Sequence, residues 1–554
     1  MDSRLSTTSV VRMVWILACA SAACSSATTP NAGSGGSAGS GSAGTSGPGG
    51  SSANGYGGNA SGSPNASGSG GSSAGSGGAS TGGSGGSGSN VSGGSGSSGG
   101  NGSGGSTPGG VTVRLDATHQ TIQGFGINTA WMPSSKSLPI DKVFGTTGPD
   151  AIGLSILRVG MSPTGALIGP LVPEAKAKGA KIIGSAFSPP ASCKSNGNTQ
   201  QGGYLLETCF DSYSTSIAKF AQAQGLYAMS IGDAPDFASC KDPPCIGDFD
   251  STMFTAKQMA AWVKVAGPKL KAEGIKVIAP EVIEWIHAWS NASATGSLVP
   301  EHPHSLDSLN CGCFSNTPTE TGCAQTCLDG NGYDYGHWLW KDQEAWQAFD
   351  IFGVHEQDSQ IAYAWPTDVN GGKRNKEVWQ TDMSGLKYWP EEGPSTDINN
   401  AVAVAGWIHS ALTVGEASAW LWGFYESYFL DDNQGLALTK GGATAAKRYY
   451  TLGNYSRFVR PDFVAVEVVG NSNHDVLLSA YHGPDGTVVV VAVNKGTVAV
   501  SLPIAITGGT APAMLTPTVT SATDNLKDFT AVTLTGGSFT AMLPSMSVTT
   551  FSGK

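Results

Sequence analysis

From residue 111 onward, short apolar segments alternate with longer stretches of mixed polarity. This alternation is typical of parallel β/α units, in which each buried strand is followed by a helix. The predicted strands lie at 121–127, 154–159, 181–187, 227–232, 275–280, 350–355, 377–382 and 418–423. Eight such units predict an α/β fold of the closed (β/α)8, or TIM-barrel, type.

Two of the connecting stretches have the apolar spacing of an amphipathic helix. The first predicted helical face carries Met259, Trp262, Val263, Ala266 and Leu270. The second carries Ile398, Val402, Ala405, Ile408 and Leu412. We expect both faces to be buried.

A different pattern begins at about residue 461, where apolar and polar positions alternate in short runs. These runs lie at 475–480, 487–493, 511–519 and 546–551, and Gly, Pro and Asn separate them. The pattern predicts a C-terminal β-sandwich over 461–554, following a barrel over 111–460. A strand at 111–115 is expected to pair with the first barrel strand and so to tie the two domains together.

Residues 1–24 have the features of an export signal, with basic residues before an apolar run that is too short to span a bilayer. Cys24 follows small residues and is a candidate for lipidation, which would attach the protein to a membrane. Plain secretion is the alternative, because Ser21 stands where a lipoprotein signal usually has Leu. The expected location is outside the cell, either free or as a cell-surface lipoprotein.

Residues 25–110 consist almost wholly of Gly, Ser, Ala, Asn and Thr. They offer too little apolar surface to offset the entropy of ordering the chain, so they predict a disordered linker. A Gly/Ser coil of this length spans roughly 50 Å between its ends. The segment is interpreted as a spacer that holds the folded domains away from a surface.

The formal net charge of -11 argues against a nucleic-acid partner, because phosphate backbones require clustered positive charge. Eight cysteines follow the linker, at 193, 209, 240, 245, 311, 313, 323 and 327. An even number in an exported chain predicts disulfides. A zinc site formed by the last four is the alternative, although their spacing departs from common zinc patterns.

Functional groups of such barrels lie on the loops after the C-terminal ends of the strands. The eight cysteines fall after the third, fourth and fifth predicted strands, so disulfides would connect loops around the barrel mouth. The stretch 284–340 is too long for a simple connection and predicts a loop subdomain over that mouth. The nine histidines do not form a metal-binding set at the strand ends, and no metal or other cofactor is expected.

Several longer segments are similar to glycoside hydrolase family 30. They are QTIQGFG at 120–126, GLSILRVG at 153–160, GSAFSPPASCKSNG at 184–197, YAMSIGDAPDF at 227–237, EVWQTDMS at 377–384 and KRYYTLGNYSRFVRP at 447–461. The resemblance covers nearly all of 111–554. It implies a barrel with an attached β-sandwich, a β-linked polysaccharide as substrate, and an enzyme that we expect to act as a monomer.

The resemblance also implies a retaining mechanism with two glutamates, an acid/base on the fourth strand and a nucleophile on the seventh. This chain departs from the family at both positions. Asp233 stands at the family's Asn and Ala234 at the acid/base Glu, while Pro235 remains in register. Asp382 stands at the nucleophile, with its oxygens withdrawn by roughly 1.5 Å relative to Glu.

Three hypotheses follow for the altered site. In the first, another carboxyl group transfers the proton, and the candidates are Asp233, Asp236, Glu281 and Glu356. A separation of roughly 6.5 to 9.5 Å from Asp382 would then fit inversion, so the stereochemistry stays open. In the second, the chain keeps its cleft as a tethered carbohydrate-binding protein without catalysis. In the third, the fold is a surface scaffold without a ligand.

The remaining site predictions concern substrate binding. The resemblance implies that Arg158 supports the carboxylates, although a structural ion pair is also compatible with its position. His355 matches a family histidine at the end of the sixth strand. Aromatic residues at strand ends are candidates for stacking on sugar rings: Trp131, Phe187, Phe237, Trp285, Trp365, Trp389 and Trp422. Of these, Phe187 and Trp422 match family positions at the sugar subsite.

Overall fold

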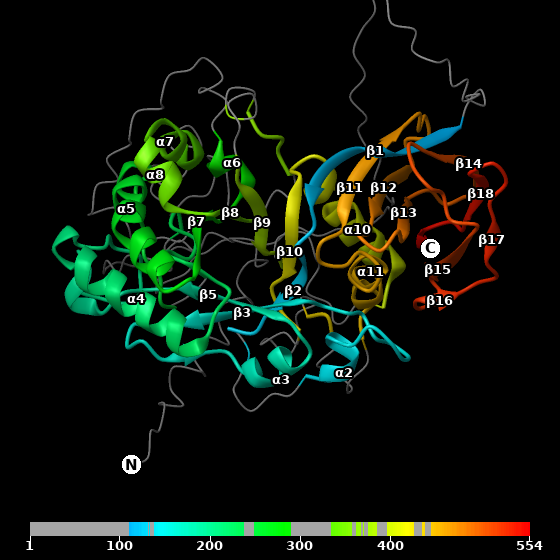
Figure 1. Ribbon diagram of the computed structural model, residues 1–554. Coiled ribbons are helices and arrows are strands. Elements are labelled where there is room, and N and C mark those ends of the chain that lie inside the picture. Colours follow the sequence, from blue (N-terminus) through cyan, green and yellow to red (C-terminus); the bar gives the residue numbers. More distant parts are fainter. Residues whose placement is uncertain are drawn as a thin grey trace, which may run out of the picture. The chain divides into compact units, whose positions relative to one another are not determined.

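The computed structural model describes residues 110–554, apart from 131, 133–137, 238–248, 290–333, 357–361, 367–368, 370–374, 385–395, 426–434 and 438–444 (Figure 1). The predicted export signal and almost the whole predicted linker lie outside the described residues. So do most of the predicted loop subdomain and six of the eight late cysteines. Within the described part of the chain, no helix is both long and apolar enough to cross a membrane.

Eight parallel strands close into a barrel, in the order β2, β10, β9, β8, β7, β6, β5, β3, with β3 pairing back onto β2. They are β2 (Gly124–Asn128), β3 (Ile156–Met161), β5 (Lys181–Ala186), β6 (Ala228–Ser230), β7 (Lys276–Val282), β8 (Ile351–His355), β9 (Glu377–Asp382) and β10 (Ala417–Trp422). The predicted barrel is therefore confirmed. A two-residue strand, β4 (Leu167–Ile168), pairs antiparallel with β3.

Branched and aromatic side chains fill the barrel interior, as the tapering space inside eight strands requires. They form a separate core cluster of Ile156, Ile183, Ala228, Ile278, Ile351, Trp379, Ala419 and Leu421. Every one is at most 1% exposed. Because these apolar side chains fill the barrel interior, the C-terminal ends of the strands are the place where polar side chains can meet.

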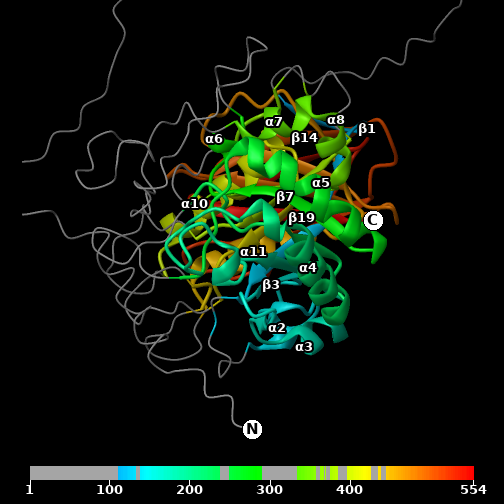
Figure 2. The same cartoon turned by 90° about the vertical axis from the view of Figure 1, so that its left-hand side faces the viewer.

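Helices surround the barrel, namely α2 (Ile140–Val143), α3 (Val172–Ala177), α4 (Phe210–Gln224), α5 (Ala256–Ala272), α6 (Trp285–Ala288), α7 (Tyr335–Lys341), α8 (Gln343–Ala348), α10 (Ile398–Thr413) and α11 (Lys447–Ser456). Both predicted amphipathic faces, on α5 and α10, are buried as expected. The α5 helix begins after Thr255, whose side chain accepts a hydrogen bond from the backbone of Gln258 and so satisfies a free N–H. Figures 1 and 2 show α4 and α5 side by side outside the barrel.

The C-terminal β-sandwich is built from β1 (Val111–Thr121) and from β11 (Val464–Val469), β12 (Val476–His482), β13 (Val488–Asn494), β14 (Val500–Thr507), β15 (Met514–Thr520), β16 (Lys527–Asp528), β17 (Val532–Thr533), β18 (Ser538–Leu543) and β19 (Ser547–Gly553). The main strand order is β16, β15, β19, β13, β12, β11, β1, β14, β18. The prediction of a sandwich is confirmed.

The predicted pairing of the 111–115 strand with the first barrel strand is wrong. The β1 strand pairs antiparallel with β11 and parallel with β14, both in the sandwich. The physical reason is the alternation of side chains along this strand, which points Val111, Val113 and Leu115 into the sandwich core. The chain therefore begins its ordered part in the sandwich and only then enters the barrel.

The α11 helix joins barrel and sandwich through buried hydrogen bonds. Asn454 donates from Nδ2 to the backbone oxygen of Thr518 at 3.0 Å, and its own backbone oxygen accepts from Thr550 Oγ1 at 2.6 Å. One apolar cluster continues from the barrel helices into the sandwich, where it includes Tyr481 and Val491. This continuity makes barrel and sandwich a single packed body.

Candidate active site

A single buried arginine connects three carboxyl groups at the C-terminal end of the barrel. Arg158, on β3, is 1% exposed. Its Nη1 lies 3.1 Å from Asp382 Oδ2, and its Nη2 contacts Asp233 Oδ1 and lies 3.4 Å from Glu281 Oε1. A buried guanidinium is stable only when carboxylates compensate its charge, so the cluster is a mutually dependent unit. Asp233, Glu281 and Asp382, the residues predicted to be catalytic, are all part of it.

Asp382 ends β9, and its Oδ2 is contacted by side chains of two other strands. Asn128, the last residue of β2, donates from Nδ2 to Asp382 Oδ2 at 2.8 Å. On the other side, a Cβ added at Gly423 would lie 2.6 Å from Asp382 Oδ1. Glycine is therefore required at 423 to leave room for the carboxylate in its observed position.

Glu281 and Asp233 share a hydroxyl donor. Ser185 Oγ, on β5, lies 2.6 Å from Glu281 Oε2 and 3.3 Å from Asp233 Oδ1. Glu281 is fully buried and has a positive φ of 61°, in the left-handed region that few side chains adopt. Neither Asn128 nor Ser185 was predicted from the sequence. Asn128 is the last residue of β2, so inspection of the strand ends could have found it.

His355, at the end of β8, completes the cluster. Its Nε2 lies 3.6 Å from Glu281 Oε1 and 3.4 Å from Arg158 Nη2. Burial alone would lower the pKa of His355, but the Glu281 carboxylate outweighs this effect and raises the pKa above its ordinary value. His355 therefore adds a second positive charge to the cluster over a wider pH range than an isolated histidine.

The two carboxyl groups that share Ser185 have opposite proton affinities. Burial, together with the nearby charges of Glu281 and Asp382, raises the pKa of Asp233 in spite of its contact with Arg158. Burial also acts to raise the pKa of Glu281, but Arg158, His355 and the Ser185 hydroxyl outweigh it and hold that pKa well below its usual range. A proton taken up by this cluster accordingly resides on Asp233 rather than on Glu281.

Ala234 follows Asp233 and has an apolar environment. It is 6% exposed and packs with Phe237, Ile283 and Phe249 in a small cluster of its own. Its φ of 41° places a methyl-bearing residue in the left-handed region. No proton donor is present on this side chain, and its apolar neighbours in the cluster supply none.

The other candidates for a relocated acid have structural contacts. Asp236 accepts the backbone N–H of Ile283 at 2.9 Å and lies 2.6 Å from Nδ1 of His287. Glu356 accepts the backbone N–H of Trp285 at 3.3 Å. Both residues thus anchor the segment that follows β7 and lie outside the Arg158 cluster.

Asp233, Glu281 and His355 are also close enough together to hold a metal ion. The Nη2 atom of Arg158, however, approaches all three side chains. A permanent positive charge at that point opposes the binding of a second cation. We therefore assign the arrangement to carboxylate positioning rather than to metal binding.

The predicted aromatic positions that the structure describes are deeply buried, and Trp389 lies outside the described residues. Phe187 is 2% exposed and Trp422 is 0% exposed. The ring of Phe187 lies against Gly160. The ring centroid of Trp422 lies 5.8 Å from that of Trp420 and 5.7 Å from the guanidinium carbon of Arg448. Trp131 lies outside the described residues, and a stacking role for these rings stays a prediction.

One disulfide is present among the described cysteines. It joins Cys193 to Cys209 and closes a loop with a sequence separation of 16 after β5. The predicted presence of disulfides is confirmed by this pair, which closes the single connection between β5 and α4 and does not join separate loops. The four cysteines of the alternative zinc site lie outside the described residues.

Comparison with known proteins agrees with this architecture. Residues 464–551 match the model of the glycosyl hydrolase family 30 beta sandwich domain. The glucuronoxylanase XynC of Bacillus subtilis (strain 168) is 25% identical over 462 residues, which cover 80% of this chain and 91% of that protein.

Solved structures share the fold of both domains. The family 30 subfamily 8 xylanase Xyn30A of Clostridium acetobutylicum superposes with a TM-score of 0.60 at 23% identity, covering 80% of this chain and 100% of that one. An endo-beta1,6-glucanase superposes with a TM-score of 0.52 at 14% identity, covering 80% and 94%. The family model matches the sandwich and the relatives extend over the barrel as well, so the chain is similar to proteins of glycoside hydrolase family 30 across both domains.

Proposed function

We propose that the chain hydrolyses a β-linked polysaccharide of the xylan, β-1,6-glucan or β-1,6-galactan type outside the cell. The observation that carries this proposal is the guanidinium of Arg158, which contacts Asp382 through one terminal nitrogen and Asp233 through the other. A hydrolase of this class needs two carboxyl groups on opposite sides of one glycosidic bond. The relatives named above, a glucuronoxylanase, a xylanase and a β-1,6-glucanase, support the class of substrate.

In the proposed mechanism, Asp382 is the nucleophile and Asp233 is the proton donor. A carboxylate oxygen of Asp382 attacks the anomeric carbon, and the bond to the leaving oxygen breaks with its electron pair. The proton held by Asp233 passes to that oxygen. Water then attacks the anomeric carbon, releases Asp382 and returns a proton to Asp233.

Retention is the outcome that this geometry supports. Carboxyl groups bound to the two terminal nitrogens of one guanidinium lie close together, as in retaining enzymes at roughly 5 to 5.5 Å. An inverting enzyme must leave space for a water molecule between its carboxyl groups.

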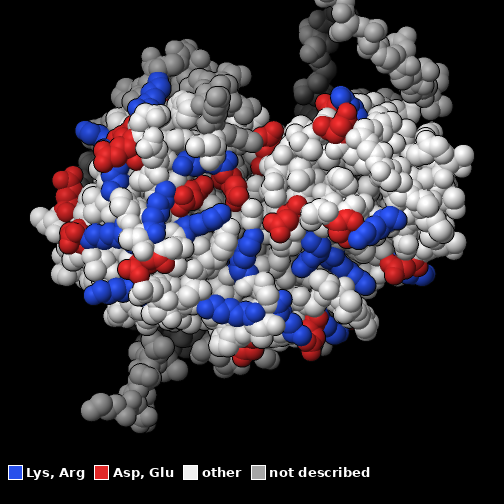
Figure 3. Space-filling view, in the orientation of Figure 1, with Lys and Arg blue, Asp and Glu red and all other residues white. Residues whose placement is uncertain are grey.

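The charge pattern of the surface is compatible with a weakly charged substrate, because basic and acidic side chains are interspersed on the face shown in Figure 3.

The test uses the purified full chain with soluble xylan, β-1,6-glucan and β-1,6-galactan, followed by product analysis. Incubation with the matching 2-deoxy-2-fluoro glycoside should add one sugar to Asp382, detected by peptide mass spectrometry. Asp382→Asn should remove both hydrolysis and labelling, and Asp233→Asn should remove the alkaline limb of the pH profile. Hydrolysis without labelling, or a product of inverted configuration, would contradict the assigned nucleophile.

A second candidate function is favoured by the environment of Ala234. Ala234, which packs only with apolar side chains in its cluster, occupies the position at which the family resemblance places the acid/base carboxyl group. A cell-surface carbohydrate-binding protein that has lost catalysis would have this appearance. Binding of a polysaccharide without hydrolysis by the native chain would establish that function and exclude the first.

A further inference from the structure

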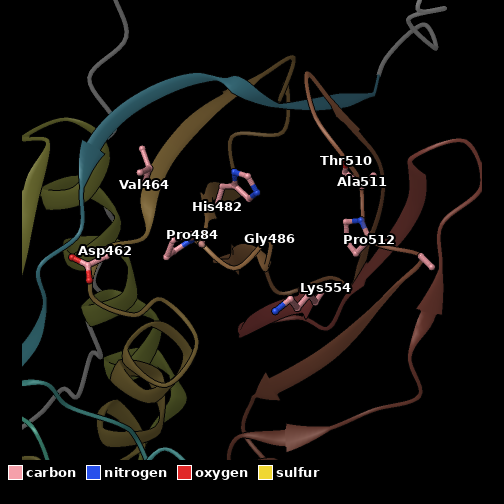
Figure 4. A pocket seen from close by; sticks show the side chains of 11 residues that line it. Asp462, Val464, His482, Pro484, Gly486, Thr510, Ala511, Pro512 and Lys554 are labelled. Atoms are coloured by element: carbon pink, nitrogen blue, oxygen red, sulfur yellow. The ribbon is translucent and has the colours of Figure 1, made fainter.

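A cavity lies in the β-sandwich, away from the Arg158 cluster. Its volume is about 710 Å³, within the range of roughly 300 to 1,000 Å³ that small-molecule sites occupy. The lining comes from segments far apart in the sequence: the start of β11, the turn after β12, the stretch before β15, and the residue after β19. Figure 4 shows His482 and Pro512 projecting into the same space from opposite sides, with Lys554 along its lower edge.

The walls of this cavity are rigid. His482 is paired across the sheet with Val464, which in turn is paired with Thr121 of β1. The turn that follows is closed by hydrogen bonds from Gly483 N to Thr487 O at 2.7 Å and from Gly486 N to Gly483 O at 3.0 Å. A cavity between paired strands and a closed turn is preformed, so a ligand need not order it on binding.

The polar groups of the lining leave capacity for a ligand. Within the described part of the chain, the imidazole of His482 makes no hydrogen bond or ion pair, and it can both donate and accept. The Asp462 carboxylate at the rim likewise makes no side-chain hydrogen bond there. Thr510 contributes a further hydroxyl group.

The electrostatics of the cavity do not favour an anion. The amino group of Lys554 is already paired with Asp485 at 3.1 Å, and Asp462 adds a negative charge at the rim. The remaining lining is aliphatic, from Val464, Pro484, Ala511 and Pro512. Aliphatic surfaces together with a few donors and acceptors match a molecule that has C–H faces and hydroxyl edges but no charge.

We propose that this cavity is a second binding site for a neutral glycan chain, separate from the site of hydrolysis. The pyranose rings would lie against the proline and valine side chains, with hydroxyl groups bonded to His482, Thr510 and Asp462. Such a site would keep a polymer on the enzyme between cleavage events and raise its effective concentration at the barrel. The proposal does not require catalysis, because binding at the sandwich can persist in an inactive chain.

The test uses the full chain with Asp382→Asn, which prevents turnover. Hydrogen exchange is measured with and without soluble xylan or soluble β-1,6-glucan, and protection is expected in 482–486 and 510–513. His482→Ala and Thr510→Arg should each remove this protection and weaken binding about tenfold. His482→Ala does so by the loss of one or two hydrogen bonds, and Thr510→Arg by filling the space that the glycan would occupy. His474→Ala, an exposed histidine on the same sandwich, is the matched control and should change neither.

The enzymatic readout separates this proposal from the proposed function. In the catalytically intact chain, His482→Ala should lower activity on insoluble polysaccharide and leave kcat/KM on a short soluble glycoside unchanged. Two results would overturn the second site while leaving the proposed hydrolysis intact. One is protection confined to barrel segments, and the other is equal glycan binding by the native chain, His482→Ala and Thr510→Arg. Protection at the sandwich without any hydrolysis would instead reject only the proposed function.

Discussion

The guanidinium of Arg158 lies 3.1 Å from the carboxylate of Asp382, although the two residues belong to strands that are not neighbours in the barrel. Strands β2 and β10 lie between them, and Asn128 of β2 contacts the same carboxylate oxygen. The position of Asp382 is therefore determined from two other strands and not only by its own backbone. Since the reaction depends on the placement of this oxygen, the residues around it are the most informative to change.

Replacing Arg158 with Met should unfold or strongly destabilise the protein. The change leaves Asp233, Glu281 and Asp382 as buried carboxyl groups without their common counter-charge. Breaking a buried ion pair in this way costs about 3–5 kcal/mol. Urea denaturation followed by intrinsic fluorescence measures the free energy of unfolding directly.

The matched control is Arg114→Ala. Arg114 pairs with Glu467 at 2.8 Å, but its side chain is 47% exposed. A solvent-exposed pair contributes about 0–1 kcal/mol, so this variant should unfold close to the native midpoint. Equal destabilisation by the two variants would show that the Arg158 cluster is not an interdependent buried unit.

Gly423→Ala should lower kcat. The added Cβ would lie 2.6 Å from Asp382 Oδ1, which is too close for both atoms to stay in place. A displaced nucleophile loses about one to two orders of magnitude in rate. Gly406→Ala is the control, because its Cβ would meet only Leu477 at 3.9 Å. An unchanged kcat for Gly423→Ala would mean that the Asp382 position is not critical.

The pH dependence of stability should reflect Glu281. Its folded-state pKa is lowered, so its ionised form stabilises the protein above the unfolded pKa of about 4.3. This contribution is lost as the pH falls below that value and towards the lowered folded-state pKa. Glu281→Gln removes this dependence, and its melting temperature should therefore fall less steeply between about pH 4.5 and pH 3.

Asp233 acts in the opposite direction. Because its folded-state pKa is raised, its contribution is fully present below the unfolded pKa and is lost as the pH rises through the folded-state pKa. Asp233→Asn should accordingly stabilise the protein on the alkaline side of that transition relative to the native chain. Identical melting profiles of native chain and both variants across this range would contradict the assigned proton distribution.

The barrel was predictable because its strands are buried on both faces and are therefore nearly continuous apolar runs. The same principle failed for β1, since its alternating pattern fits any half-buried strand and does not identify the partner. Residues at strand ends were a reliable guide to His355 and Asp382, whereas Arg158 lies within β3 and its role was inferred from the family resemblance. Local pattern carries this information because parallel strands all end at the same edge of a barrel.

Other features of the site depend on packing and not on local sequence. Glu281 lies at a positive φ within β7, at an irregularity in the pairing of β7 with β8. Its contact with Arg158 requires β3, β5, β6 and β7 to be in register. The opposite proton affinities of Asp233 and Glu281 arise from neighbours on other strands. Ser185 was missed because a serine within an apolar strand gives no signal until its hydrogen-bond partners are known.

Removing the Cys193–Cys209 disulfide should destabilise the folded chain. The bond closes a loop with a sequence separation of 16, and a loop of that size restricts the unfolded chain by about 3 kcal/mol. The double Ser variant should therefore show a lower urea midpoint. Native-like stability of this variant would show that the loop is held by its other contacts, such as that between Lys194 and Ser188.

Ala234→Glu should increase the hydrolysis of polysaccharides whose leaving groups require protonation. The new carboxyl group would lie among Phe237, Ile283 and Phe249, and burial in such surroundings raises its pKa and keeps it protonated near neutral pH. The gain should be at least about tenfold in kcat/KM on polysaccharide, within the range of general acid catalysis, and much smaller on a nitrophenyl glycoside, which needs little assistance. Ala234→Gln has the same shape without the proton and is the matched control. If Ala234→Glu and Ala234→Gln have equal effects, or if neither changes the rate on either substrate, position 234 does not face the leaving group. The assignment of proton transfer to Asp233 would then rest on the pH profile of Asp233→Asn.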